Sequence, residues 1–107
     1  KAVAGFVKAT IKGIQDTIKS PETAIDSLMK RNPIAKRDVE LERLRLSLSR
    51  NFVTPDVLKN GLGGVDPKRL ERSFDQIGLT FKYTAKPKAA DIFTTQYLPP
   101  KEQRLVK

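Results

Sequence analysis

AVAGFVKATIKGIQDTIKSPETAIDSLMKRNP, residues 2–33, predicts two consecutive helices and makes this a mostly α-helical chain. Over residues 2–19 one arc of side chains recurs with the helical period of about 3.6 residues. That arc contains Val3, Phe6, Val7, Thr10, Ile11, Ile14 and Ile18, and the opposite side contains Lys1, Lys8, Lys12 and Lys19. We therefore expect an amphipathic helix over residues 2–19.

The second helix is expected to begin at Ser20-Pro21-Glu22, because a Ser hydroxyl can cap the free N–H groups and Pro suits the first helical position. Asn32-Pro33 ends it, since the residue before Pro avoids helical angles. Its expected buried residues are Ala24, Ile25, Leu28 and Met29. We expect these two helices to form a hairpin. Gly13, which costs about 1 kcal/mol relative to Ala in a helix, indicates that another backbone packs close to it, either from this chain or from a part of the protein outside it.

Asp38 can cap a third helix that is predicted to run to about Arg50, with Glu40–Arg43 and Glu42–Arg45 as surface ion pairs. Its apolar residues are divided between two faces. Leu41, Leu44 and Leu48 form one stripe, whereas Val39 and Leu46 project from nearly the opposite side. One neighbouring helix can cover only one of these faces, so we expect the other to require cover from elsewhere.

The rest of the chain predicts shorter elements. Thr54-Pro55 begins a short helix to about residue 59, and Asp66-Pro67 begins one to Ile77, which Gly78 closes in a left-handed conformation. Strict alternation over 79–86 predicts a strand, residues 87–93 a turn or two of helix, and residues 99–107 a loose surface tail. The predicted core residues are Phe6, Ile14, Leu28, Leu44, Leu70 and Phe74, and the predicted caps are Ser20, Thr54 and Asp66.

Composition excludes most enzyme chemistry. The 107 residues, 38% hydrophobic and 31% charged, suit one small domain, and Cys and His are both absent. Thiol nucleophiles, imidazole bases, disulfides and the common zinc and haem ligand sets are therefore excluded. Each Asp or Glu has an ordinary place at a helix start or in a helix-surface pair, so we predict no catalytic residue, no metal ligand and no cofactor. No stretch approaches the ~20 apolar residues that span a bilayer.

The segment NGLGGVDPKRLERSF, residues 60–74, has two interpretations. A glycine-rich loop before a helix can cradle phosphate, but a nucleotide loop needs Lys and Ser or Thr directly after its last glycine. Val65, Asp66 and Pro67 stand there instead. The Asp carboxylate would also occupy the helix N-terminus that an anion would use. We favour a structural loop followed by a helix cap.

A formal charge of +9, from 21 Lys and Arg against 12 Asp and Glu, raises the possibility of a polyanionic partner. The lysine face of the first helix could follow a nucleic-acid backbone or an anionic membrane. Aromatic residues are only 7% and are not interleaved with the basic ones, as stacking binders require. We therefore favour a solvated face, and a small basic helical nucleic-acid-binding module remains the alternative.

Four segments taken in order resemble the C-terminal part of periplasmic substrate-binding proteins of the nitrate, sulfonate, taurine and thiamine-precursor type. They are AGFVKATIKGIQDTIKSPETAIDSLMKRNP (4–33), DVELERLRLSL (38–48), GLGGVDPKRLERSFDQIGL (61–79) and KPKAADIFTTQYLP (86–99). The resemblance covers nearly the whole chain. It agrees with a helical pattern already running at Val3 without a capping residue before it, from which we expect a piece of a longer chain.

The resemblance implies a type 2 periplasmic binding protein, which has two α/β lobes and holds a small organic solute in the cleft between them. It implies a periplasmic, non-enzymatic protein that delivers its solute to the membrane permease of an ATP-binding cassette importer. Residues 1–98 would be a C-terminal segment of such a protein. The family's ligand contacts lie mainly upstream of the matched segment, so the ligand-binding residues stay unknown. Exposed apolar faces would favour self-association of the piece alone, and no nucleic acid is expected as a partner.

Overall fold

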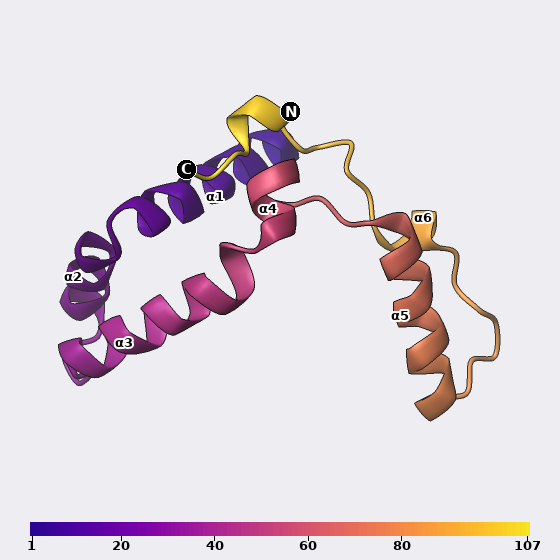
Figure 1. Ribbon diagram of the computed structural model, residues 1–107, viewed down its shortest axis with the longest axis horizontal. Helices are drawn as coiled ribbons and strands as arrows, with labels where there is room; N and C mark the ends of the chain where they lie inside the picture. Colours follow the sequence, from indigo (N-terminus) through magenta and orange to yellow (C-terminus); the bar gives the residue numbers. More distant parts are fainter.

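The computed structural model of the protein describes residues 1–107 and contains helices and no strand (Figure 1). The helices are α1 (Ala2–Lys19), α2 (Pro21–Arg31), α3 (Arg37–Ser47), α4 (Pro55–Asn60), α5 (Pro67–Thr80) and α6 (Ala89–Ile92). A π-helical stretch, η1 (Leu48–Phe52), continues α3, and a single turn, η2 (Lys101–Gln103), lies near the C-terminus. The mostly α fold class expected from the sequence is confirmed.

Helices α1 to α4 form one group, and α5 with α6 stands apart from it (Figure 1). A single residue, Ser20, separates α1 from α2, so the two helices meet end to end at a corner. The predicted hairpin of the first two helices is therefore wrong, because an antiparallel pair needs a loop of about 2–5 residues. Helix α2 packs instead against α3, across the loop that begins at Asn32.

Two small clusters hold the first group together. Ile11 of α1, Leu62 and Val106 are buried against one another, with Val7, Ile14, Ile18, Phe52, Val57 and Leu98 packed around them. Ile25 of α2 and Leu48 at the start of η1 are the other buried apolar side chains. Because so few residues are buried, most helices keep a large part of their apolar faces in solvent.

The predicted core is only partly correct. Phe6 is 74% exposed and Leu28 is 37% exposed, so both predictions are wrong. Phe6 lies at the margin of the apolar arc of α1, and the contacts of that arc centre on Ile11. Four other predicted core residues, Ile14, Leu44, Leu70 and Phe74, are half-buried. The second face of α3 is exposed as expected, with Val39 at 43% and Leu46 at 59%.

The C-terminal segment is not the loose surface tail predicted for residues 99–107. Val106 is only 7% exposed, and the Gln15 side chain of α1 donates hydrogen bonds to the carbonyls of Gln103 and Leu105 at 3.0 and 2.8 Å. The segment returns to lie beside α1, as Figure 1 shows. Pro99 and Pro100 suggested a broken tail, but only long-range contacts with α1 and Leu62 decide where the chain packs.

The predicted strand over 79–86 is also wrong. Helix α5 runs through Gly78 to Thr80, and Gly78 does not have the left-handed conformation that was expected of it. The chain then turns back along α5, where the Tyr83 hydroxyl donates to the Phe74 carbonyl at 3.3 Å. A strand needs a partner strand for its N–H and C=O groups, and this chain offers none. The short helix predicted within 87–93 is present as α6.

Two of the three predicted helix caps, Thr54 and Asp66, are present. The Thr54 hydroxyl accepts a hydrogen bond from the Val57 N–H at 3.2 Å, and Asp66 Oδ1 accepts one from the Arg69 N–H at 3.0 Å. Ser20 precedes α2 as expected, but its hydroxyl bonds to the Thr23 hydroxyl and caps no backbone N–H. Helix α3 begins one residue before Asp38, so that residue lies in the first turn and is not its cap.

Candidate functional site

The glycine-rich loop between α4 and α5 serves packing. Gly61 and Gly63 have φ values of +82° and +85°, which glycine adopts without strain. A Cβ at Gly61 would lie 3.1 Å from the backbone of Arg104, and one at Gly63 would lie 2.7 Å from Leu98 Cδ2. The two glycines therefore allow the loop to turn and the C-terminal segment to approach it closely.

The start of α5 is already occupied by Asp66. The carboxylate of this residue accepts the Arg69 N–H, so the N-terminus of α5 carries a negative charge of its own. A polar hollow of about 520 Å³ beside it is lined by Asp56, Lys68, Arg69, Arg72 and Ser73, among others. Its basic side chains are exposed and stand together with two carboxylates. This arrangement supports the structural loop and cap that the sequence favours.

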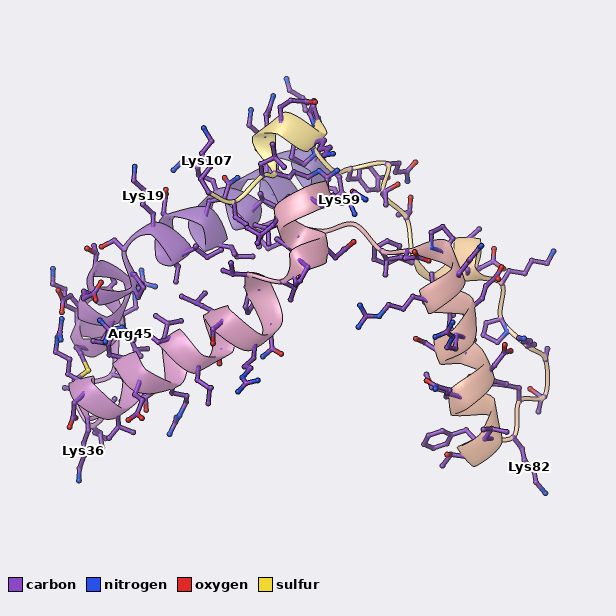
Figure 2. All side chains as sticks on the ribbon, in the orientation of Figure 1. Lys19, Lys36, Arg45, Lys59, Lys82 and Lys107 are labelled. Carbon is purple, nitrogen blue, oxygen red and sulfur yellow. The ribbon has the colours of Figure 1, made fainter.

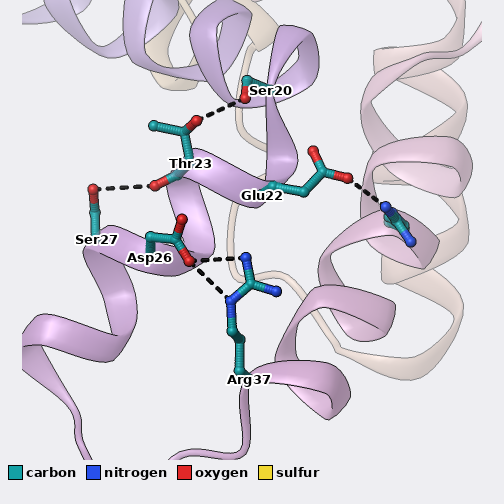
Figure 3. A network of polar contacts seen from close by, with 7 residues as sticks. Ser20, Glu22, Thr23, Asp26, Ser27 and Arg37 are labelled. Carbon is teal, nitrogen blue, oxygen red and sulfur yellow. Dashed lines mark hydrogen bonds and ion pairs between the residues drawn. The ribbon is translucent and has the colours of Figure 1, made fainter.

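The carboxylates lie mainly in surface ion pairs. On α2, Glu22 pairs with Arg45, and Asp26 accepts hydrogen bonds from the Arg37 guanidinium at 2.8 and 2.9 Å, so two ion pairs join α2 to α3 (Figure 3). A hydrogen bond from its own backbone, and then the bond from Arg45, hold the pKa of Glu22 below its ordinary value of 4.5. The Glu40–Arg43 pair is present, whereas Arg45 takes Glu22 in place of the expected Glu42.

No group of three or more Asp or Glu side chains lies together in a way that would hold a metal ion. At the far end of the molecule, Lys86 and Asp75 form an ion pair at 2.5 Å, and the hydrogen bond that Lys86 donates to the Asp75 carboxylate raises the pKa of Lys86 above its ordinary value of 10.5. Both side chains are more than 60% exposed. These carboxylates and bases form surface ion pairs that stabilise local structure.

An apolar hollow lies between α1 and the segment from η1 to Leu62. It has a volume of about 430 Å³ and is lined by Phe6, Val7, Thr10, Ile11, Ile14, Asn51, Phe52, Val57, Leu62, Gly63 and Leu98. We call it the α1 groove. Phe6 stands at its edge with most of its ring in solvent, and Ile11 and Leu62 lie at the buried core. The groove has the apolar lining and the size typical of a binding surface.

Lys1, Lys8, Lys12 and Lys19 form a row along α1, which we call the lysine row, and most of its members form no ion pair. Lys12 pairs with Asp16, whereas Lys1, Lys8 and Lys19 take part in no ion pair. Lys19 projects away from the body of the molecule at the end of α1 (Figure 2). The row therefore forms a positively charged edge along α1, as the sequence predicts.

Two structurally important residues were not recognised from the sequence. Arg104 donates to the carbonyls of Pro99 and Leu62 at 2.9 and 2.5 Å, and Gln15 donates to the carbonyls of the residues on either side of Arg104. Nothing in the sequence around Gln15 distinguishes it from other polar residues of α1, and Arg104 is one of 21 Lys and Arg residues. The glycines of the 61–64 loop were the sequence signal for a close approach, and the structure places Arg104 against Gly61 and Leu98 against Gly63.

Comparisons with protein-family models, with curated proteins and with solved structures found no match to this chain. None of the helices has the length and apolar composition that crossing a bilayer requires.

Proposed function

We propose that the chain is a C-terminal segment of the solute-binding component of an ATP-binding cassette importer. In this proposal the whole protein captures a small organic solute, such as a sulfonate, taurine, nitrate or a thiamine-precursor-like compound, in the periplasm. It then delivers the solute to the membrane permease. The sequence resemblance over four successive segments suggests the family, and the helical architecture is compatible with it.

The observation that carries the proposal is the amount of surface the chain leaves uncovered. Its accessible surface is 8681 Å², whereas a compact protein of this mass exposes about 6,000 Å². Its Cα radius of gyration is 17.0 Å, against about 13 Å for a compact domain of the same length. The helices therefore have faces suited to packing on further protein.

The exposed apolar residues are distributed as this proposal requires. Val39 and Leu46 of α3 are exposed, and Leu79 at the end of α5 is 89% exposed. Scattered exposed leucines are common, but these residues recur on both groups of helices. In the proposed parent protein, the remaining parts of the α/β lobes would cover them.

The experiment starts from the complete reading frame that encodes this segment. We expect it to contain alternating strands and helices upstream, and to lie beside genes for a permease and an ATPase. The purified full-length protein is then titrated with taurine, alkanesulfonates, nitrate and a thiamine-precursor pyrimidine. Thermal unfolding and calorimetry are recorded for each. A ligand at 100 times its Kd should stabilise the folded state by about 2.7 kcal/mol.

Two outcomes would reject the transport role. One is a reading frame that contains no α/β lobes and has no transporter genes near it. The other is a two-lobed protein whose melting temperature responds to none of the solute classes while it hydrolyses or modifies one of them. The 107-residue chain alone serves as the control, because it should show no solute-dependent shift if the cleft lies upstream.

A further inference from the structure

We propose that the lysine row of α1 and the C-terminal segment beside it form a surface that binds an anionic lipid bilayer by electrostatic attraction. The contact is with the surface of the bilayer and does not depend on the transport role. It rests on where the positive charge of the chain lies, on the geometry of the lysine row and on the residues that surround the row.

The positive charge of the chain is concentrated at one edge. Residues 1–19 and 101–107 contain seven of the 21 Lys and Arg residues and two of the 12 Asp and Glu residues, so they carry a net charge of +5 out of +9. These two segments lie together, because the Gln15 side chain donates hydrogen bonds to the carbonyls of Gln103 and Leu105. Lys107 lies near Lys19 on this edge (Figure 2), and both line a hollow of about 290 Å³ beside Gln15. About a quarter of the chain therefore carries more than half of its net charge.

The lysines of the row point in nearly one direction. At about 100° and 1.5 Å per residue, their positions fall within about 40° of one another round α1 and extend over about 27 Å along it. Neighbouring lysines are about 6–11 Å apart along the helix, so their fields overlap at a screening length of about 10 Å. All four residues are exposed, and Lys1, Lys8 and Lys19 form no ion pair. A plane of negative charge can therefore approach the whole row at once.

Two acids lie near the row. Asp16 stands about 40–80° round α1 from the lysines and is already paired with Lys12. Glu102 of η2 is exposed and lines the same hollow as Lys19 and Lys107. Because one acid is neutralised by its own ion pair and the bases outnumber the acids, the edge keeps an excess of positive charge.

The surroundings of the row contain no apolar anchor. Gly5 and Ala9 flank it on one side, and a Cβ added to Gly5 would meet no atom within 4 Å. Phe6 lies about 140° round α1 from the row and so faces another side. Protein interfaces depend on buried aromatic and apolar anchors, whereas lipid phosphates need only charge and an open approach. The row therefore fits a charged surface better than a folded partner.

A flat surface also suits the row better than a nucleic acid does. Each strand of B-form DNA winds once round the duplex axis in about 34 Å, so a row that runs for about 27 Å along one side of a helix cannot follow one strand over its whole length. Single strands are held by aromatic side chains that stack on the bases, and the only aromatic residue of α1 is Phe6. A bilayer instead presents its phosphates in a plane.

The test measures binding of the 107-residue chain to lipid vesicles. One set of vesicles contains phosphatidylcholine with about 30% phosphatidylglycerol, and the other contains phosphatidylcholine alone. Binding is followed by cosedimentation at about 0.05 M and about 0.5 M salt. We expect binding to the anionic vesicles at low salt, loss of this binding at high salt, and no binding to the neutral vesicles. Inorganic phosphate at the same phosphate concentration should not compete, because free ions do not form a charged plane.

The variants assign binding to the proposed edge. Lys8→Gln combined with Lys19→Gln should weaken binding to the anionic vesicles about 25-fold, since each lysine near an anionic surface contributes a factor of about five. The matched control is Lys36→Gln combined with Lys82→Gln, which removes the same charge at two distant points of the molecule (Figure 2). It should change binding by less than about twofold, because both points lie beyond the screening length from the row. Asp16→Asn removes the acid beside the row and releases Lys12, so it should strengthen binding about fivefold.

Three results would overturn the proposal. Equal weakening by the two double substitutions, with the circular dichroism of every variant unaltered, would mean that the net charge of the chain determines binding and not the edge. Stronger binding to duplex DNA than to the anionic vesicles at equal phosphate concentration, lost in the Lys8→Gln and Lys19→Gln chain, would assign the edge to nucleic acid. Absence of binding to the anionic vesicles at low salt would exclude a bilayer surface as the partner.

Discussion

Leu62 and Arg104 bind each other through two hydrogen bonds, although 42 residues separate them. The Leu62 N–H donates to the Arg104 carbonyl at 2.8 Å, and the Arg104 guanidinium donates to the Leu62 carbonyl at 2.5 Å. A third bond runs from Arg104 Nε to the Pro99 carbonyl at 2.9 Å. This contact joins the glycine-rich loop to the C-terminal segment and helps to bury Leu62 and Val106 beside α1.

Arg104→Ala should therefore destabilise the chain by about 1–3 kcal/mol, because it leaves two partly buried carbonyls without their charged donor. The measurement is urea denaturation followed by circular dichroism. Arg104→Lys should recover only part of the loss, because a single ammonium group does not reproduce the guanidinium geometry. If Arg104→Ala leaves the denaturation midpoint unchanged, the C-terminal segment is not held by this contact.

Val106→Ala should cost about 1.5–3 kcal/mol, since it removes two buried carbon groups and leaves a space beside Ile11 and Leu62. The neighbouring Lys107→Ala is the control, because Lys107 is exposed and should change stability by less than about 0.5 kcal/mol. Both are measured by thermal unfolding. Equal effects of the two substitutions would indicate that residues 99–107 form a loose tail, as the sequence predicts.

The sequence predicts local features of this chain better than long-range ones. The caps at Thr54 and Asp66 were predictable because donor and acceptor lie three residues apart, so the residue types alone specify the bond. Val106 could not be recognised as a core residue, since the side chains that bury it lie far away in the sequence. For the same reason the sequence did not predict that Arg45 pairs with Glu22 of α2 and not with the neighbouring Glu42.

The alternating segment after Gly78 shows the limit of periodicity. A period of two residues describes how side chains would be arranged on a strand, but it provides no partner for the backbone. Here Tyr83 returns to the Phe74 carbonyl and Lys86 to Asp75, so the segment packs back on its own helix. The α1 groove was unpredictable for a related reason, because Phe52 and Leu98 complete it from distant parts of the chain.

Substitutions at two glycines should have opposite effects on stability. Gly63→Ala places a Cβ 2.7 Å from Leu98 Cδ2 at a residue whose φ is +85°, so we expect clear destabilisation, of about 1 kcal/mol or more. Gly13→Ala lies within α1, where nothing stands within 4 Å, and should stabilise the chain by up to about 1 kcal/mol. Chemical denaturation of both variants distinguishes them. Destabilisation by Gly13→Ala would mean that something already packs on that face.

The lowered pKa of Glu22, caused first by a hydrogen bond from its own backbone and then by the bond from Arg45, should make stability depend on pH in the acidic range. The pKa of Glu22 is lowered in the folded chain, so its contribution is fully present above the ordinary value of 4.5. It should be lost as the pH falls below 4.5 and through the lowered folded-state pKa. Glu22→Gln removes this dependence, so we expect it to be less stable than the unchanged chain at pH 7. The two should converge near pH 2, as thermal unfolding across a pH series would show. A constant difference at all pH values would contradict this.

Leu46 and Leu48 offer a direct test of the uncovered face of α3. Leu48 is 8% exposed, so Leu48→Lys places a charge in a buried site and should destabilise the chain by about 3 kcal/mol or more. Leu46 is 59% exposed, so Leu46→Lys should change the stability of this chain by less than about 0.5 kcal/mol. In the longer protein proposed above, Leu46→Lys should instead be costly, because the charge would lie against the covering lobe. Chemical denaturation of both variants in both proteins measures this difference, and a large loss for Leu46→Lys in the 107-residue chain alone would show that this face is already covered.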